Sequence, residues 1–189
     1  IACAVAQNPG NPALQALAAD ALTWHIDAPT VGVSPYQGLA FFDVGDADRF
    51  FGRDKLTAEL VAYLKDHHFL AVVGASGSGK SSVARAGVVA TLKQGKQIKG
   101  SDRWAIYIVK PDIHPLKTLA AALTQESESV TAQATLMDDM RKDTRSLDLF
   151  AARLVARTGA RRLLIVVDQF EELFTLCKDP DEQRAFVDN

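Results

Sequence analysis

Runs of apolar residues alternate with stretches of helical periodicity along most of this chain. Three apolar runs have the length and β-branched content of buried strands, at residues 69–73 (FLAVV), 104–109 (WAIYIV) and 163–168 (LLIVVD). The third run has no polar position before its closing aspartate. Such a pattern is typical of a strand that helices cover on both faces of a parallel sheet.

Apolar residues recur at helical spacing in the segments around these runs. The spacing predicts a short helix that Asp46 caps and that reaches Phe50. It also predicts longer helices over residues 55–65, 83–92, 115–123 and 145–157, and a helical turn over residues 169–174. Residues 126–135 are polar and predict a flexible connection. Because strands and helices take turns, the chain is predicted to have an α/β fold with parallel strands.

The N-terminal region differs from the rest. Residues 1–28 contain one predicted helix, near positions 11–22, and no pattern that indicates chemistry, so we expect a linker or the tail of a preceding domain. Four Pro and Gly residues between positions 29 and 38 then predict an extended segment. We place a domain boundary near Pro29, with residues 29–189 in the second domain. The chain begins without Met and ends within a charged helical pattern, so we expect it to be a piece of a longer protein.

Composition excludes some classes of function. The 189 residues are 48% hydrophobic and 23% charged, which suits one domain with a real core. The net charge of −2 argues against non-specific binding of nucleic acid, and no apolar run has the length of a membrane helix. The two cysteines, Cys3 and Cys177, lie near opposite ends and favour a reducing compartment such as the cytoplasm. We therefore expect no direct contact with nucleic acid or a membrane.

The string GASGSGKS at residues 74–81 matches the phosphate-loop pattern G-x-x-x-x-G-K-[ST] at every fixed position. A predicted strand precedes it and a predicted helix follows, as a P-loop NTPase of three-layer α/β/α architecture requires. Lys80 is expected to place its charge near the β- and γ-phosphates, and the Ser81 hydroxyl to ligate Mg²⁺. The residues predicted to bind the nucleotide here are Gly74, Ala75, Ser76, Gly77, Ser78, Gly79, Lys80, Ser81 and Ser82.

Asp168 closes the third predicted strand, where a carboxylate that serves Mg²⁺ is expected opposite a P-loop. Glu171 and Glu172 follow and are candidates to orient an attacking water, with Glu171 preferred. Gln169 stands where many P-loop ATPases carry the catalytic acid, a departure that argues against hydrolysis but not against nucleotide binding. With Lys80, these three carboxylates make up the predicted catalytic set.

The missing guanine-recognition motif predicts which nucleotide base the site binds. GTPases carry an Asn/Thr-Lys-x-Asp motif after the strand that ends in the magnesium-binding Asp, and the nearest string here is Val109-Lys-Pro-Asp112, which lacks the Asn and precedes that strand. Adenine is therefore favoured, with ATP or ADP as the nucleotide. Arg53, next to Gly52 and one helix before the loop, either covers the nucleotide or is a solvated residue at a helix start.

Four motifs in order carry a resemblance to a known family. They are SPYQGL from Ser34, RFFGRD from Arg49, VGASGSGKSSV from Val73 and VDQFEELF from Val167. From residue 34 to the end, the chain resembles the STAND signalling ATPases, most closely the bacterial novel STAND NTPases of type one. The resemblance implies a switch that binds ATP between the P-loop domain and a helical lid and hydrolyses it slowly. It places Arg53 near the nucleotide, and it makes Gln169 normal at its position.

The resemblance also has implications for the rest of the polypeptide. Members usually carry an effector upstream and a repeat sensor downstream, often a WD-repeat propeller, and a homo-oligomer on activation stays an option. The strand order 5-1-4-3-2 of this class puts a fourth strand between the 69–73 and 163–168 strands. We therefore expect three strands in this chain, with the fourth strand and the lid beyond Asn189.

Other functions stay open on the sequence. A working ATPase of the AAA+ or ABC type would need a finger arginine or a signature loop from a neighbour, and no ABC-type signature string is present. A nucleic-acid-binding ATPase is disfavoured by the near-neutral charge. A nucleotide-binding scaffold without turnover is the remaining alternative.

Overall fold

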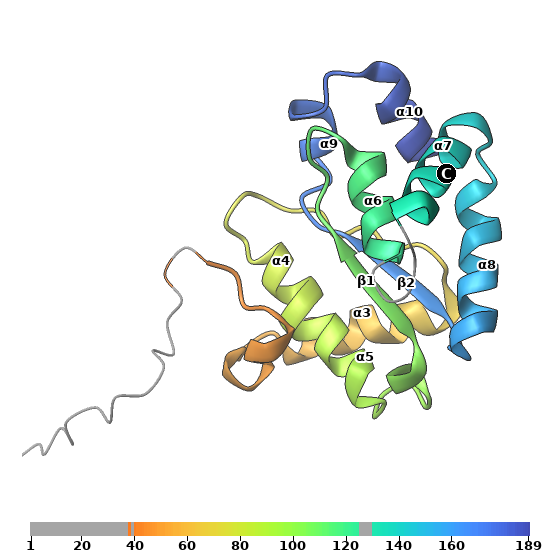
Figure 1. The fold of residues 1–189 in the computed structure, drawn as a ribbon. Coiled ribbons are helices and arrows are strands. Elements are labelled where there is room, and N and C mark those ends of the chain that lie inside the picture. The colour runs from red at the N-terminus through yellow and green to blue at the C-terminus, as the bar shows by residue number, and fades with distance from the viewer. Residues whose placement is uncertain (1–37, 39, 125–129) are drawn as a thin grey trace, which may run out of the picture. The chain divides into compact units, whose positions relative to one another are not determined.

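Two parallel strands form the sheet around which helices pack in the computed structural model (Figure 1). The structure describes residues 38, 40–124 and 130–189, which belong to a compact unit that begins at Gln37. Strand β1 (Ala105–Val109) pairs with β2 (Leu163–Val167) in a register that sets Ala105 opposite Leu163. The two sequence-predicted strands at these positions, and their parallel direction, are confirmed.

Side chains alternate between the two faces of this sheet, as the twofold period of a strand requires. One face holds Tyr107, Val109, Leu163, Ile165 and Val167, which pack into the larger of two cores. The elements that bury apolar side chains in that core are α6 (Pro115–Thr124), α7 (Val130–Lys142), α8 (Ser146–Thr158), α9 (Glu172–Thr175) and α10 (Pro180–Asp188).

The other face carries Ile106 and Leu164, which pack against a smaller core of Val61, Leu64, Val88 and Leu92. These four residues come from helix α3 (Asp54–Asp66) and from the helix that follows the phosphate loop. A short 3₁₀-helix, η1 (Val44–Arg49), precedes α3, and another, η3 (Ser101–Arg103), leads into β1. The sheet therefore has helices on both faces.

The helix after the phosphate loop is not a regular α-helix. It runs without a break through α4 (Lys80–Ser82), a π-helical stretch η2 (Val83–Val89) and α5 (Ala90–Gln94). Within it the Ala90 N–H donates to the carbonyl of Arg85, five residues earlier, which is the π-helical pattern. The helix ends at Gly95, whose φ of 68° suits a glycine cap.

The predicted strand over residues 69–73 is wrong for this structure, which has a two-stranded sheet in the part of the chain that it describes. Phe69 is 79% exposed and Val73 91% exposed, and no hydrogen-bonded partner lies beside them among the described residues. A strand exists only through its pairing, and an apolar run alone does not supply that pairing.

Two further expectations need correction. The first short helix is capped by Asp43 rather than by Asp46; Asp46 is its third residue and bonds back to the Asp43 N–H in a capping box. Residues 130–135, predicted as part of a flexible connection, form the first turns of α7. The helix predicted near positions 11–22, the extended segment up to position 37, and Cys3 lie outside the described residues.

The remaining predicted helices are confirmed as α3, α6, α8 and the helix after the phosphate loop, each within two or three residues of the expected bounds. The helical turn expected over residues 169–174 is α9. Of the described helices, none has both the length and the apolar character to cross a membrane.

Candidate nucleotide-binding site

The phosphate loop (residues 74–81) has the backbone conformation that its glycines permit. Gly77 and Gly79 have φ of 74° and 86°, in the left-handed region where other residues are strained. At Gly74 a Cβ atom would lie 3.1 Å from the Ser78 hydroxyl oxygen, a tight contact that the serine side chain would have to relieve by moving. The loop residues before Gly79 are exposed, so the cradle is open.

Lys80, the first residue of α4, folds back over this loop. Its ammonium group donates hydrogen bonds to the carbonyls of Gly74 at 2.9 Å and Ala75 at 3.0 Å. The positive charge is therefore held at the start of the loop by backbone oxygens rather than extended into solvent. An anion bound in the loop would meet this charge together with the unpaired N–H groups of the helix start.

Asp168 is brought to the same place by the sheet. It follows β2, and its N–H donates to the Val109 carbonyl at 2.8 Å, which continues the ladder by one residue. Its carboxylate is buried, with 9% of the residue exposed. The Ser81 hydroxyl donates to Oδ1 at 2.8 Å although the two residues are 87 positions apart. The serine and aspartate predicted to serve Mg²⁺ are thus in direct contact.

Arg85 is a member of this cluster that the sequence analysis missed. Its Nε donates to Oδ2 of Asp168 at 2.9 Å, and its side chain is only 14% exposed. The spacing contained a signal, since Arg85 stands four residues after Ser81 and residues at that interval share a helix face.

These donors fit a magnesium ion. Mg²⁺ takes oxygen ligands, keeps several of its waters and needs only one or two groups from the protein. The Ser81 hydroxyl and the Asp168 carboxylate would hold it, and it would supply charge neutralisation at the phosphates when bound. In the described parts of the chain, no cluster of three or more His, Cys, Asp or Glu forms a denser metal site.

The two glutamates that follow Asp168 have different surroundings. Glu172 forms an ion pair with Lys110, with 2.9 Å between Oε1 and Nζ. Glu171 is exposed and makes no side-chain hydrogen bond or ion pair with the described residues. Gln169, between Asp168 and the glutamates, has a φ of 55°, which is rare for a residue with a side chain. The backbone thus turns sharply straight after the buried carboxylate.

Two other predicted residues lie at the edge of the site. Ser82 is buried, and its hydroxyl accepts a hydrogen bond from the Phe42 N–H at 3.0 Å. The side chain is therefore directed toward Phe42 and not toward the phosphate loop. Arg53 precedes α3, is exposed, and forms no side-chain hydrogen bond or ion pair within the described part of the chain. Its contact with a nucleotide stays a prediction. The exposed Ala75 and Ser76 belong to the open loop.

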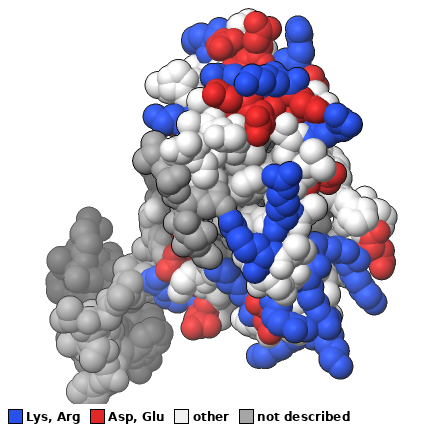
Figure 2. Space-filling view, turned by 45° about the vertical axis from the view of Figure 1, so that its right-hand side comes forward, with Lys and Arg blue, Asp and Glu red and all other residues white. Residues whose placement is uncertain are grey.

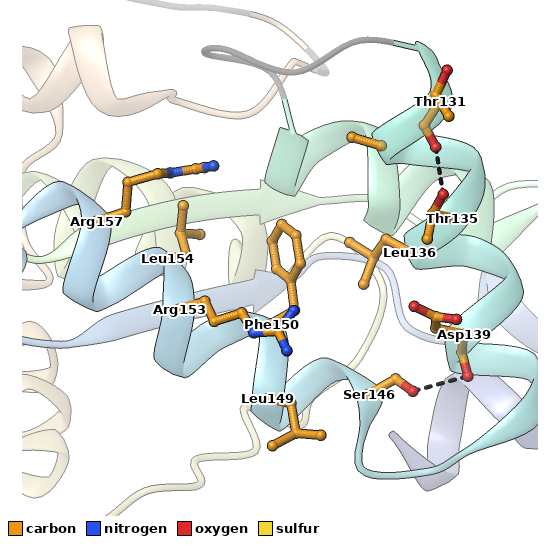
Figure 3. Close-up of a pocket in the computed structure, with 11 residues that line it drawn as sticks. Thr131, Thr135, Leu136, Asp139, Ser146, Leu149, Phe150, Arg153, Leu154 and Arg157 are labelled. Atoms are coloured by element: carbon orange, nitrogen blue, oxygen red, sulfur yellow. Dashed lines mark hydrogen bonds between the residues drawn. The ribbon is translucent and has the colours of Figure 1, made fainter.

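A cavity of about 660 Å³ lies elsewhere, between α7 and α8. Phe150, Leu136 and Leu154 line its apolar part, and Arg153 stands beside them in Figure 3. None of the phosphate-loop residues or Asp168 borders this cavity. It is separate from the candidate nucleotide site.

Four basic residues between positions 93 and 103 lie at the end of the sheet opposite Asp168. Lys93, Lys96, Lys99 and Arg103 are all exposed and precede β1, whereas Asp168 follows β2. Figure 2 shows basic side chains gathered over the lower part of the molecule, with acidic and basic ones mixed at the top. This charge is therefore distant from the phosphate loop.

Comparison with known families identifies the family to which this chain belongs. The family model described as novel STAND NTPase 1 matches residues 35–189, which include the phosphate loop, Arg85 and Asp168. The chain belongs to the novel STAND NTPase 1 family. Membership makes this part of the chain a nucleotide-binding NTPase domain and confirms the resemblance seen in the sequence. No curated protein and no solved structure matches this novel STAND NTPase chain.

Proposed function

We propose that this domain is an adenine-nucleotide switch, which binds ATP or ADP with Mg²⁺ and hydrolyses ATP slowly within a multidomain signalling protein. The observation that carries the proposal is the 2.8 Å hydrogen bond between Ser81 and Asp168, next to a phosphate loop that already holds the Lys80 ammonium. A serine and a carboxylate in contact beside a lysine are the set that Mg²⁺ and a polyphosphate require.

The roles of the residues follow from their positions. The backbone N–H groups of residues 74–79 and the helix start would bind the phosphates, and Lys80 would exchange its carbonyl partners for phosphate oxygens. Ser81 and Asp168 would hold Mg²⁺. We keep Arg53 as a proposed contact to the nucleotide on the strength of the family resemblance.

Slow turnover is supported by the residues after Asp168. Fast hydrolysis needs a group that orients water at the γ-phosphate. Gln169 provides no carboxylate, and Glu172 is occupied by Lys110, so Glu171 is the remaining candidate and it lies exposed on a short turn. Differential affinity for ATP and ADP, rather than rapid turnover, would then move the domain between two states.

We also propose that the domain has the three-layer P-loop fold. Support comes from the parallel β1–β2 pair, which has helices on both faces. By the family resemblance, an upstream effector, a downstream repeat sensor and a helical lid complete the protein, which we place in the cytoplasm.

Nucleotide binding in the full-length protein tests the proposal. Fluorescent ADP is titrated into wild type, Lys80→Ala and Lys93→Ala; Lys93 is an exposed lysine further along the same helix and serves as the matched control. We expect Lys80→Ala to lose at least about tenfold in affinity, because a charge-assisted contact is removed, and Lys93→Ala to match wild type. Equal affinity of Lys80→Ala and wild type would overturn the site.

Steady-state turnover separates the switch from its alternatives. A rate well below one per second, with tightly held ADP, supports the switch. Many turnovers per second would instead indicate a working ATPase, and binding with no turnover would indicate a nucleotide-binding scaffold.

A further inference from the structure

Arg85 lies between the buried carboxylate of the site and the chain that enters the domain. Its guanidinium contacts Asp168 at 2.9 Å through Nε and the Asp43 carboxylate at 3.4 Å through Nη1. The same group stacks over the Phe41 ring, 4.5 Å from the centroid. One side chain thus joins the predicted Mg²⁺ ligand to residues 41–43, which we call the entry segment.

The entry segment has a second attachment at Ser82, directly next to the site. The Phe42 N–H donates to the Ser82 hydroxyl at 3.0 Å, and Ser82 is the neighbour of Ser81. The Phe42 ring lies 5.8 Å from the Phe50 ring, which in turn approaches Gly87 of η2. Both attachments, at Arg85 and at Ser82, therefore lie on the helix that follows the phosphate loop.

The Asp168 carboxylate uses both of its oxygens in this arrangement. Ser81 donates to Oδ1 and Arg85 to Oδ2, so that the rotation of the carboxylate is fixed from two sides. Because Arg85 also pairs with Asp43, the group that contacts Oδ2 is attached to the entry segment as well. The Arg85 guanidinium is shared between a buried acid and one that is 53% exposed.

We propose that Arg85 is a positioning residue that orients Asp168 for Mg²⁺ and couples the Mg²⁺-nucleotide site to the docking of the entry segment. The proposal rests on the proposed nucleotide function. Coupling of this kind is reciprocal, since a segment that favours the bound form is itself held more firmly when Mg²⁺ and nucleotide are bound.

The test measures how much Mg²⁺ strengthens nucleotide binding in the full-length protein. Affinity for fluorescent ADP is determined with excess Mg²⁺ and with EDTA, and the ratio of the two is the Mg²⁺ gain. In Arg85→Met, which keeps the apolar stem and loses the charge, we expect the gain to fall by about tenfold while the affinity in EDTA stays at the wild-type value. Arg85→Lys should recover part of the gain.

A second variant separates the coupling from the local role. Asp43→Asn removes the charge that pairs with Arg85 and keeps a residue that caps a helix equally well. We expect its Mg²⁺ gain to fall by about threefold, whereas Asp48→Asn, an exposed aspartate of η1, should leave the gain unchanged.

The three possible negative results test three different claims: the positioning role, the coupling and the nucleotide function. An unchanged Mg²⁺ gain in Arg85→Met, or an equal loss of affinity with Mg²⁺ and EDTA, would overturn the positioning role. An unchanged gain in Asp43→Asn would overturn the coupling, and this variant stays informative if Arg85→Met fails to fold. Absence of nucleotide binding by wild type in both conditions would instead overturn the proposed function.

Discussion

The two faces of the β1–β2 sheet are built differently. On the face covered by α6, α7, α8 and α10, the core contains eleven buried apolar residues among those described; on the face that carries the candidate site it contains four. The second face is instead held together by polar and close-packed contacts. These are the Arg85–Asp168 pair, the Ser82–Phe42 hydrogen bond and the approach of Thr57 to Gly87.

The two faces therefore derive their stability from different interactions. Burial of apolar area stabilises without regard to direction, whereas charged and hydrogen-bonded pairs hold particular atoms in particular places. The large core therefore anchors the domain, whereas the smaller face holds Asp168 through directed contacts. Each of the following changes tests one side of this contrast.

Truncation of matched core leucines should give the largest effect. Leu116, in the large core, and Leu92, in the small one, are both 0% exposed. We expect Leu116→Ala to lower the free energy of unfolding by about 2–5 kcal/mol and Leu92→Ala to fall at the lower end of that range, because a sparsely packed cluster collapses more easily around the lost atoms. Urea denaturation of both variants measures this. A larger loss for Leu92→Ala would reverse the comparison.

A methyl group at Gly87 should have a smaller effect whose sign depends on Thr57. The added Cβ would lie 2.7 Å from the Thr57 hydroxyl oxygen, so we expect Gly87→Ala to destabilise by about 1–3 kcal/mol. In a Thr57→Ala background the clash is removed, and the same change should become stabilising by up to about 1 kcal/mol through helix propensity. A double-mutant cycle in denaturant measures both; additive effects would show that the two residues are not in contact.

The smallest effect concerns the turn between α7 and α8, next to the large core. Hydrogen bonds from the Arg145 side chain and backbone lower the pKa of Asp143 from 3.8 to about 2. Because the folded-state pKa is depressed, the resulting stabilisation is present above the unfolded value and is lost as the pH falls through about 2. In Arg145→Ala we expect the pKa of Asp143 to rise toward 3.8 in an NMR titration. An unchanged pKa would show that the pair is not formed in solution.

The sequence predicted the parts of the fold that depend on local pattern. The apolar runs at 104–109 and 163–168 became the paired strands β1 and β2, and Asp168 lies where a strand-end carboxylate was expected. The run at 69–73 looks the same in sequence, but whether it is a strand depends on a partner and not on its own residues. The cap of η1 was misplaced because Asp43 and Asp46 form one capping box. In it, the side chain of each residue accepts a hydrogen bond from the backbone N–H of the other.

The connections of Arg85 could not be read in the same way. Its partners Asp43 and Asp168 are 42 and 83 positions away, and periodicity reports only which residues share a face of one element. Similarly, the apolar residues in the first turns of α7 are only Val130 and two alanines, and the buried residues that fix the helix, Leu136 and Met140, come after them. In each case the decisive interaction lies outside the window that a local pattern covers.

The π-helical stretch η2 constrains how this chain can change in length. It lies between Ser81, whose hydroxyl contacts Asp168, and Leu92, which is buried in the small core. A π-helical stretch accommodates one extra residue in an α-helix, so deleting one residue from Val83–Val89 would restore regular winding while Ser81 and Leu92 keep nearly the same relative orientation. Deleting a second residue would turn them by about 100° relative to each other, and they could not then both keep their partners. We therefore expect homologous chains to accommodate the loss of one residue within η2, but not of two.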